Sequence, residues 1–237
     1  KAISRVPSLP FVLAPLLSHN SGLVHASEAK YVLDPEGNLT TTADRILPIV
    51  ESITLKKGWK WDGIVGSMPE TSFMEDAVTQ KHGLLLYCGH GGGQGCLSKS
   101  KVDKMIAVNA GSFDNATLIL MGCSSGKLVS VNTKGMDYFD QVPIHYEPEG
   151  IALSYLCAGS PCVVGNLWDV TDRDIDKYCI TLLESFLSGH GERSMAKCVA
   201  DARSACKMKH LVGLAPVCYG IPVHLADPQL RREECRE

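Results

Sequence analysis

Residues 83–93 read "GLLLYCGHGGG", an apolar run that leads directly into a histidine set among glycines. A continuous apolar run of this length, bounded by glycines, is typical of a strand that is buried on both faces of a sheet. A second run, "ATLILMGCSSG" at 116–126, ends in the same way on a cysteine, and a third follows in "PCVVGNLW" at 161–168. We therefore predict three buried strands, two of which end on a chemically reactive side chain.

Segments with helical patterns separate these runs. Strands that are apolar on both faces and alternate with helices form mostly parallel sheets covered on both sides. The fold class that we predict is α/β, with a central, mostly parallel sheet flanked by helices on both faces. We expect helices at 41–58, 70–83, 100–108, 147–159, 171–189 and 192–207, and further strands at 30–35 and 61–69.

The composition of the 237 residues excludes some classes of protein. Hydrophobic residues make up 45% of the chain, enough for a large core, and the formal net charge of -3 argues against a general binder of the phosphate backbone. No apolar stretch reaches the ~18 residues of a membrane-spanning helix. The start lacks an initiator methionine and its apolar patch is broken by prolines, so we expect an internal fragment and not a signal peptide.

The ten cysteines do not suggest a disulfide framework. Most of them lie inside apolar segments, where a free thiol packs as a small hydrophobic group. The sequence has no CxxC pair and no spacing of cysteine and histidine that is typical of a metal site. We expect no metal, no cofactor and a reducing compartment.

The position of His90 and Cys123 predicts a site. In open parallel sheets, ligands bind beyond the carboxyl ends of the strands, so both side chains would emerge at one edge if their strands are neighbours. A thiol, an imidazole and exposed backbone N–H groups are the minimum for acyl transfer through a thioester. Each residue also has a structural alternative: a hydrogen-bonded histidine after a strand, and a cysteine that packs in the core.

The helix expected at 171–189 carries a third group of residues. Its apolar stripe places Asp172 and Asp176 on the flank that leans toward the protein, while Asp174 is expected to point away. Asp169 lies near the end of the preceding strand. Asp172 has an alternative role as a helix cap, but Asp176 lies a turn too far along. A buried carboxylate requires a cation, and an arginine or lysine of a substrate would supply one.

Several segments together resemble the protease domain of separase, a caspase-fold cysteine endopeptidase of clan CD that opens cohesin at anaphase. The similarity extends over about residues 3–225. Caspases and metacaspases share the histidine and cysteine positions but not "LWDVTDRDID". The segments that carry the resemblance are "YCGHGGG", "LMGCSSG", "AGSPCVVGNLWDVTDRDID" and "APVCYGIPV", with "SRVPSL", "YVLDPEGNL" and "WKWDGIVGSMP".

The resemblance implies roles for individual residues. It identifies His90 and Cys123 as a catalytic dyad, and the backbone N–H groups of Gly91 and Cys123 as donors to the oxyanion. It implies cleavage after arginine in a Glu-x-x-Arg site of the kleisin subunit of cohesin. The acidic pocket for that arginine maps best onto Asp176, with Asp172 as the second candidate and Asp169 as the third.

The resemblance also gives expectations for partners and domains. We expect the cohesin kleisin subunit as substrate, a securin-type inhibitor, location in the cytoplasm and nucleus, and no direct contact with a specific nucleic-acid sequence or a membrane. The chain is expected to form one caspase-like protease domain over 1–237. Within it, 1–29 reads as the tail of a preceding half-domain or a linker, 131–146 as an exposed loop, and 226–237 as a polar tail.

Two other functions remain open from the sequence. Another caspase-like cysteine protease, of the CHAT or metacaspase type, would share the dyad without requiring a Glu-x-x-Arg site. A catalytically silent scaffold would keep the fold for binding alone, although the presence of both His90 and Cys123 argues against it. Reaction with an electrophilic peptide ending in arginine discriminates among these alternatives.

Overall fold

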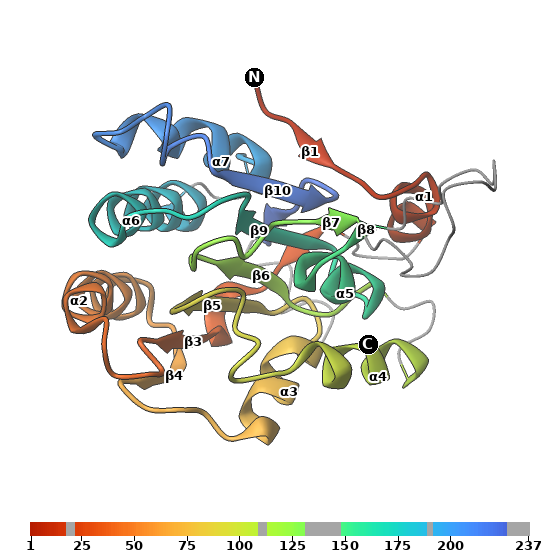
Figure 1. The fold of residues 1–237 in the computed structure, drawn as a ribbon, viewed down its shortest axis with the longest axis horizontal. Coiled ribbons are helices and arrows are strands. Elements are labelled where there is room, and N and C mark those ends of the chain that lie inside the picture. Colours follow the sequence, from red (N-terminus) through yellow and green to blue (C-terminus); the bar gives the residue numbers. More distant parts are fainter. Residues whose placement is uncertain (18–21, 109–112, 131–147, 189–191, 227–237) are drawn as a thin grey trace, which may run out of the picture.

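The computed structural model describes residues 1–17, 22–108, 113–130, 148–188 and 192–226. A seven-stranded sheet forms its centre (Figure 1). The loop predicted at 131–146 and nearly all of the tail predicted at 226–237 lie outside the described residues.

The sheet is mostly parallel, as predicted. All of its paired strands run parallel except β10 and β9, which pair antiparallel. In spatial order the strands are β1 (Ser4–Arg5), β10 (Pro216–Gly220), β9 (Cys162–Asn166), β6 (Thr117–Leu120), β5 (Leu84–Cys88), β3 (Lys30–Leu33) and β4 (Asp62–Val65).

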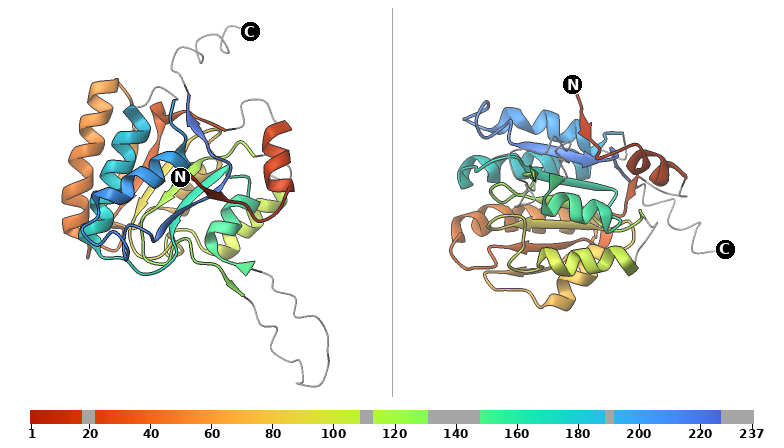
Figure 2. Two further views of the ribbon diagram at one scale, coloured as in Figure 1. Left: turned by 90° about the horizontal axis from the view of Figure 1, so that it is seen from above. Right: turned by 45° about the vertical axis from the view of Figure 1, so that its right-hand side comes forward.

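Helices cover both faces of the sheet, so the predicted fold class is confirmed (Figures 1 and 2). One face carries α2 (Thr40–Lys57), α6 (Asp172–Ser188) and α7 (Met195–Ala202). The other carries α3 (Thr71–Thr79), α4 (Lys99–Val108) and α5 (Ile151–Cys157), and α1 (Pro10–Leu17) lies at one end of this layer.

Strand β5 shows why its sequence is apolar throughout. Leu84, Leu86 and Cys88 belong to the core cluster beneath α2 and α6, whereas Leu85 and Tyr87 belong to the cluster beneath α3 and α5. Successive side chains of a strand point to opposite faces, so a strand covered on both sides buries every residue. All five residues of β5 are buried.

Residues 1–29 add strands to the fold. β1 pairs in parallel with β10 at one edge of the main sheet. β2 (Leu23–Val24) pairs in parallel with β11 (His224–Leu225), and a short 3-10 helix follows at Ala26–Glu28. The assignment of this segment to a preceding half-domain stays a prediction. A further two-stranded sheet joins β7 (Val129–Ser130) to β8 (Pro148–Glu149).

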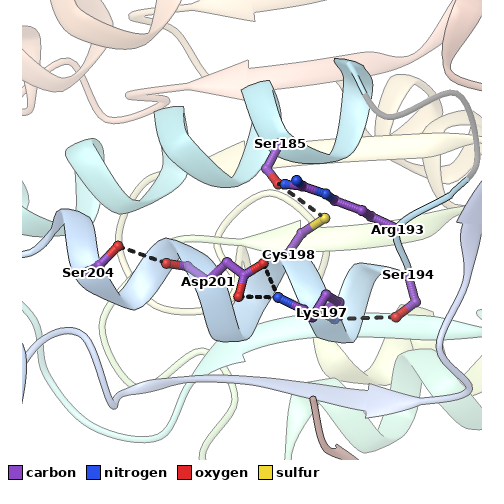
Figure 3. A network of polar contacts seen from close by, with 7 residues as sticks. All are labelled: Ser185, Arg193, Ser194, Lys197, Cys198, Asp201 and Ser204. Atoms are coloured by element: carbon purple, nitrogen blue, oxygen red, sulfur yellow. Dashed lines mark hydrogen bonds and ion pairs between the residues drawn. The ribbon is translucent and has the colours of Figure 1, made fainter. Parts of the chain in front are cut away.

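A polar network runs along helix α7 and reaches α6 (Figure 3). Ser194 caps the helix and accepts a hydrogen bond from the backbone N–H of Lys197 at 3.3 Å. The ammonium of Lys197 pairs with Asp201 one turn later. Arg193, just before α7, donates to the hydroxyl of Ser185 on α6 at 3.2 Å. The same hydroxyl lies 3.5 Å from the Cys198 thiol on α7, so the network joins the two helices.

Three features of the described residues concern a membrane span, a metal site and disulfide bonds. None of the described helices is long and apolar enough to cross a membrane. No group of three or more histidine, cysteine or carboxylate side chains in the described ranges is placed to hold a metal ion. The nine cysteines that the structure describes are all free thiols.

Candidate active site

The loops that follow β5 and β6 leave the sheet at the same edge. The two strands are parallel neighbours, with Tyr87 opposite Leu120, and the N–H of Met121 donates to the carbonyl of Tyr87 at 2.8 Å. A side chain on Gly122 would overlap the carbonyl oxygens of Gly89 and Gly91. The glycine before the cysteine is therefore required because the two loops pack backbone against backbone.

The imidazole of His90 is exposed and is held by an amide. Its Nε2 lies 2.9 Å from Oδ1 of Asn38. An amide oxygen can only accept a hydrogen bond, so Nε2 carries the proton and Nδ1 has the free lone pair. The hydroxyl of Tyr87 donates to the carbonyl of His90 at 2.8 Å and fixes the backbone from below. This arrangement leaves Nδ1 as the basic atom of the ring.

Asn38 owes its position to a buried carboxylate in the turn after β3. Asp34 is 1% exposed and has a left-handed backbone with φ of 50°. Its carboxylate accepts the backbone N–H groups of Asn38 at 2.9 Å and Leu39 at 2.8 Å. Its own N–H donates to the carbonyl of Cys88 at 2.7 Å, at the end of β5. The turn is therefore tied to the strand that precedes His90.

The thiol of Cys123 is half-buried and faces the loop after β9. Its Sγ lies 3.4 Å from both the backbone nitrogen and the carbonyl oxygen of Val170. Ser124, the next residue, has a left-handed φ of 54°, which is uncommon for a residue with a side chain. Its hydroxyl donates to Asp169 at 2.7 Å, and its N–H donates to the carbonyl of Trp168 at 3.2 Å. These bonds fix the cysteine loop against residues 168–170.

A second set of bonds supports the cysteine loop from inside. The hydroxyl of Ser125 donates to the carbonyl of Leu120 at 2.8 Å and accepts the N–H of Asn166 at 2.9 Å. The side-chain amide of Asn166 donates to the carbonyl of Gly122 at 3.0 Å. Both side chains are fully buried. The end of β9 is thus bonded to the residues on either side of Cys123.

A small pocket joins the histidine, the cysteine and the acidic helix. Its lining includes His90, Cys123, Asp172 and Asp176, and it encloses about 20 Å³. This volume holds little more than a water molecule. Asp169 is not part of the lining, because it lies on the surface with its carboxylate bonded to Ser124. Of the three acidic candidates for arginine binding, the structure therefore places Asp172 and Asp176 in one pocket with the thiol and the imidazole.

The carboxylate of Asp176 is buried and paired with groups from α2. Its side chain is 3% exposed. Oδ2 accepts hydrogen bonds from Nη1 of Arg45 at 2.7 Å and from the hydroxyl of Thr42 at 3.1 Å. Burial raises the pKa of Asp176, while the bonds from Arg45 and Thr42 act in the opposite direction. The predicted inward tilt of Asp176 is confirmed, and Asp172 lies exposed at the pocket.

The prediction for Asp174 is wrong. The helical periodicity places this residue on the solvent side, but it is 4% exposed in the structure. The segment after α7 folds back over this side of α6, and the Asp174 carboxylate accepts the backbone N–H of Met208 at 2.8 Å. The carbonyl of Asp174 lies 3.5 Å from the Cys206 thiol. A loop more than thirty residues away in the sequence therefore buries this carboxylate.

The two backbone groups expected to bind an oxyanion have no competing partner among the described residues. Neither the N–H of Gly91 nor that of Cys123 donates a hydrogen bond within this part of the chain. Gly91 has a left-handed φ of 59°, and the next N–H, that of Gly92, is taken by the side chain of Gln94 at 2.8 Å. The turn therefore occupies one donor and leaves its neighbour available.

Other thiols of the chain are poor nucleophiles at neutral pH. Burial raises the pKa of Cys96 to about 11 and that of Cys206 to about 11. A hydrogen bond to the thiol of Cys179, together with burial, raises the pKa of Cys88 well above its ordinary value. Because the thiolate is the reactive form, these three side chains remain protonated and unreactive.

Comparisons with known proteins show which family the chain belongs to. The family model described as "Separin, protease domain" matches residues 1–175. The chain belongs to the separin protease-domain family. Separin of Mus musculus is 34% identical over 233 residues, which are 95% of this chain and 10% of the relative. Separin of Schizosaccharomyces pombe is also 34% identical, over 95% of this chain and 12% of its own length.

Solved structures of the family have the same fold. The Saccharomyces cerevisiae separase in a separase–securin complex at 2.6 Å resolution superposes with a TM-score of 0.75 at 28% identity. The match covers 94% of this chain and 14% of that one. The chain thus spans about a tenth of the length of the curated separins that it matches.

The sequence patterns did not single out two residues that contact the candidate site. Asn38 and Arg45 contact the two ends of the pocket from outside it, and neither lies in a pattern of apolar spacing. The only local signal was the turn-forming segment "DPEGN" at 34–38, in which aspartate and asparagine side chains commonly bond to nearby backbone groups. The contacts themselves span 52 and 131 residues of sequence.

Proposed function

We propose that this chain is a cysteine endopeptidase that cleaves polypeptides after arginine. The observation that carries the proposal is the shared pocket, in which a half-buried thiol, an imidazole and a buried carboxylate meet at one edge of the sheet. A thiol and a base perform the chemistry, and a carboxylate beside them selects a cationic side chain. Membership of the separin protease-domain family supports the same assignment.

The first half of the reaction forms an acyl-enzyme. Nδ1 of His90 takes the proton from Sγ of Cys123, and the thiolate attacks the carbonyl carbon of the substrate arginine. The N–H groups of Gly91 and Cys123 stabilise the oxyanion. The tetrahedral intermediate collapses, the C–N bond breaks, and the imidazolium gives its proton to the departing amine. A thioester on Cys123 and the released carboxyl-terminal fragment are the products.

The second half hydrolyses the thioester. Nδ1 of His90 takes a proton from water, the hydroxide attacks the thioester carbonyl, and the same backbone donors hold the oxyanion. The C–S bond then breaks and the imidazolium returns the proton to the sulfur. Asn38 keeps the Nε2 proton in place throughout, so the same ring nitrogen performs every transfer. The cycle requires no cofactor or metal.

Asp176 is the residue that we propose for arginine selection, with Asp172 as a second acid at the pocket. A guanidinium makes two parallel hydrogen bonds to a carboxylate, which an ammonium cannot match. A pocket of about 20 Å³ is too small for an arginine side chain, so it must widen when substrate binds. Asp169, the third candidate, acts through Ser124 by holding the loop of the nucleophile.

The proposal extends to the partners of the longer protein. The cohesin kleisin subunit, cut after arginine in a Glu-x-x-Arg site, is the proposed substrate, in the cytoplasm and nucleus. The yeast separase of the solved complex is bound to securin, which supports a securin-type inhibitor for this chain. Such an inhibitor would act by covering the pocket beside Cys123.

Cleavage of matched peptides tests the proposal. Peptides with Glu-x-x-Arg, Glu-x-x-Lys and Glu-x-x-citrulline before the scissile bond should be cut in the arginine case and hardly at all in the other two. Cys123→Ser should abolish turnover without altering the circular dichroism spectrum, because oxygen is close to sulfur in size but far less nucleophilic at neutral pH. Cys88→Ser, a buried thiol at the end of β5, is the control. Loss of activity in the control with retention in Cys123→Ser would refute the assignment.

A further inference from the structure

The carboxylate of Asp176 is held from one side only. Its hydrogen bonds come from Arg45 and Thr42, both on α2, and both bonds end on the same oxygen, Oδ2. The other oxygen, Oδ1, accepts no hydrogen bond from the residues that the structure describes. A carboxylate has acceptor capacity on both oxygens, so Oδ1 keeps acceptor capacity that none of the described residues uses.

Arg45 approaches this carboxylate from outside the pocket. Its side chain is 38% exposed, whereas that of Asp176 is 3% exposed. Thr42 and Asp176 belong to the pocket lining and Arg45 does not. The guanidinium therefore does not fill the space that a substrate arginine would take. It contacts the back of the carboxylate, on the side of α2.

The contact of Arg45 with Asp176 changes the net charge of the pocket. Two carboxylates, Asp172 and Asp176, line the pocket, and two like charges close together disfavour ionisation of the more buried one. The guanidinium of Arg45 cancels one of the two charges. One net negative charge then remains for one incoming guanidinium.

We propose that Arg45 is a positioning residue for arginine selection, which holds Oδ2 of Asp176 from behind and leaves Oδ1 for the guanidinium of the substrate. The proposal rests on the proposed function, since it concerns the same pocket. It assigns to α2 a part in specificity, although α2 supplies no atom to the reaction. The groups that face Asp176 are Arg45 and Thr42 from α2, Asp172 from its own helix, and Cys88, His90 and Cys123 across the pocket.

The test compares Arg45→Gln, Arg45→Lys and Arg173→Gln in the intact protein. Arg173 is exposed on α6, close in sequence to Asp176, and forms no ion pair or hydrogen bond with the described residues, so its change removes an equal charge without touching the carboxylate. The measurements are KM and kcat for the Glu-x-x-Arg peptide from pH 5 to 9. The rate of alkylation of Cys123 by iodoacetamide, a reagent that does not use the pocket, is measured beside them.

Arg45→Gln should raise KM for the arginine peptide roughly tenfold or more at neutral pH, because an oriented charge partner is lost. The pKa of Asp176 rises when its cation is removed, because the arginine no longer stabilises the charged carboxylate. As the pH is lowered, the Arg45→Gln protein should therefore lose activity at a higher pH than the wild type. Arg45→Lys keeps the charge and should restore the pH profile. Arg173→Gln should match the wild type, and the alkylation rate should be equal in all four proteins.

Two results would overturn the inference while leaving the proposed function in place. One is a pH profile and KM for Arg45→Gln that superpose on those of Arg173→Gln. The other is a lower KM for Arg45→Gln than for the wild type, which would make Arg45 a competitor of the substrate arginine. Failure of the wild type to cleave the arginine peptide would overturn both proposals together.

Discussion

Replacing the buried acid of the pocket separates substrate selection from chemistry. In Asp176→Asn the side chain keeps its shape and loses its charge, and the oxygen that replaces Oδ2 still accepts from Thr42. Losing one partner of a buried, hydrogen-bonded charge pair costs ~2–5 kcal/mol. Since ~1.4 kcal/mol corresponds to a factor of ten, kcat/KM for arginine peptides should fall at least about thirty-fold. Arg45 then keeps its positive charge near the incoming guanidinium with no carboxylate to balance it, which favours the upper part of this range.

The same change should leave the fold almost intact. Arg45 is 38% exposed, so water solvates its guanidinium once the carboxylate is gone. Ion pairs with this much exposure contribute ~0–1 kcal/mol, and the melting temperature should fall by no more than a few degrees. Burial raises the pKa of Asp176, so the neutral amide also avoids the cost of keeping a charge in that place.

The assay pairs peptide turnover with alkylation of Cys123 by iodoacetamide. Turnover of arginine peptides should drop while the alkylation rate stays at the wild-type value. Glu184→Gln, an exposed acid on the same helix, is the matched control and should change neither. Asp174 is unsuitable as a control because its buried carboxylate holds the backbone of Met208. Equal effects of Asp176→Asn and Glu184→Gln, or wild-type turnover in Asp176→Asn, would refute the reasoning.

Three further predictions concern the dyad and its frame. Asn38→Ala removes one hydrogen bond from His90, worth ~0.5–1.5 kcal/mol, so kcat should fall about two- to tenfold while KM stays nearly unchanged. A rise in KM that exceeds the fall in kcat would contradict the role assigned to Asn38. Gly122→Ala should lower the free energy of unfolding by ~1–3 kcal/mol and remove most of the activity, because the added methyl group overlaps the carbonyl oxygens of Gly89 and Gly91. An unfolding midpoint in urea equal to that of the wild type would contradict this prediction. Alkylation of the native protein at neutral pH, mapped by mass spectrometry, should modify Cys123 well before Cys96, whose pKa is raised to about 11, and the reverse order would be inconsistent with the site.

Much of the architecture is predictable because its signals are local. The run at 83–88 is apolar on both faces, and the structure buries every residue from Leu84 to Cys88. The helix expected at 171–189 is α6, Asp172–Ser188, with its apolar stripe in the core. Strand β10 lies within "APVCYGIPV", a short apolar segment near glycines, and such a segment does not reveal that it pairs antiparallel with β9.

The site was predictable only as far as strand ends could define it. His90 and Cys123 follow from the rule for parallel sheets, and the inward tilt of Asp176 follows from helical spacing. The burial of Asp174 depends on where the segment after α7 packs against α6, and no pattern within α6 predicts that packing. The bond of Asn38 to the histidine likewise depends on the tertiary fold.

Residues 34–45 connect two functions that the chain keeps apart elsewhere. This stretch runs from the turn after β3 into the first turns of α2, and it contains both Asn38 on His90 and Arg45 on Asp176. In the proposed mechanism, two side chains of this one segment orient the base and the buried acid of the pocket, and neither contributes a reacting atom. A change in the conformation of this segment would therefore alter the pH profile and the preference for arginine together. A ligand that displaced residues 34–45 from outside the pocket would weaken proton transfer and arginine selection at once, without occupying the pocket.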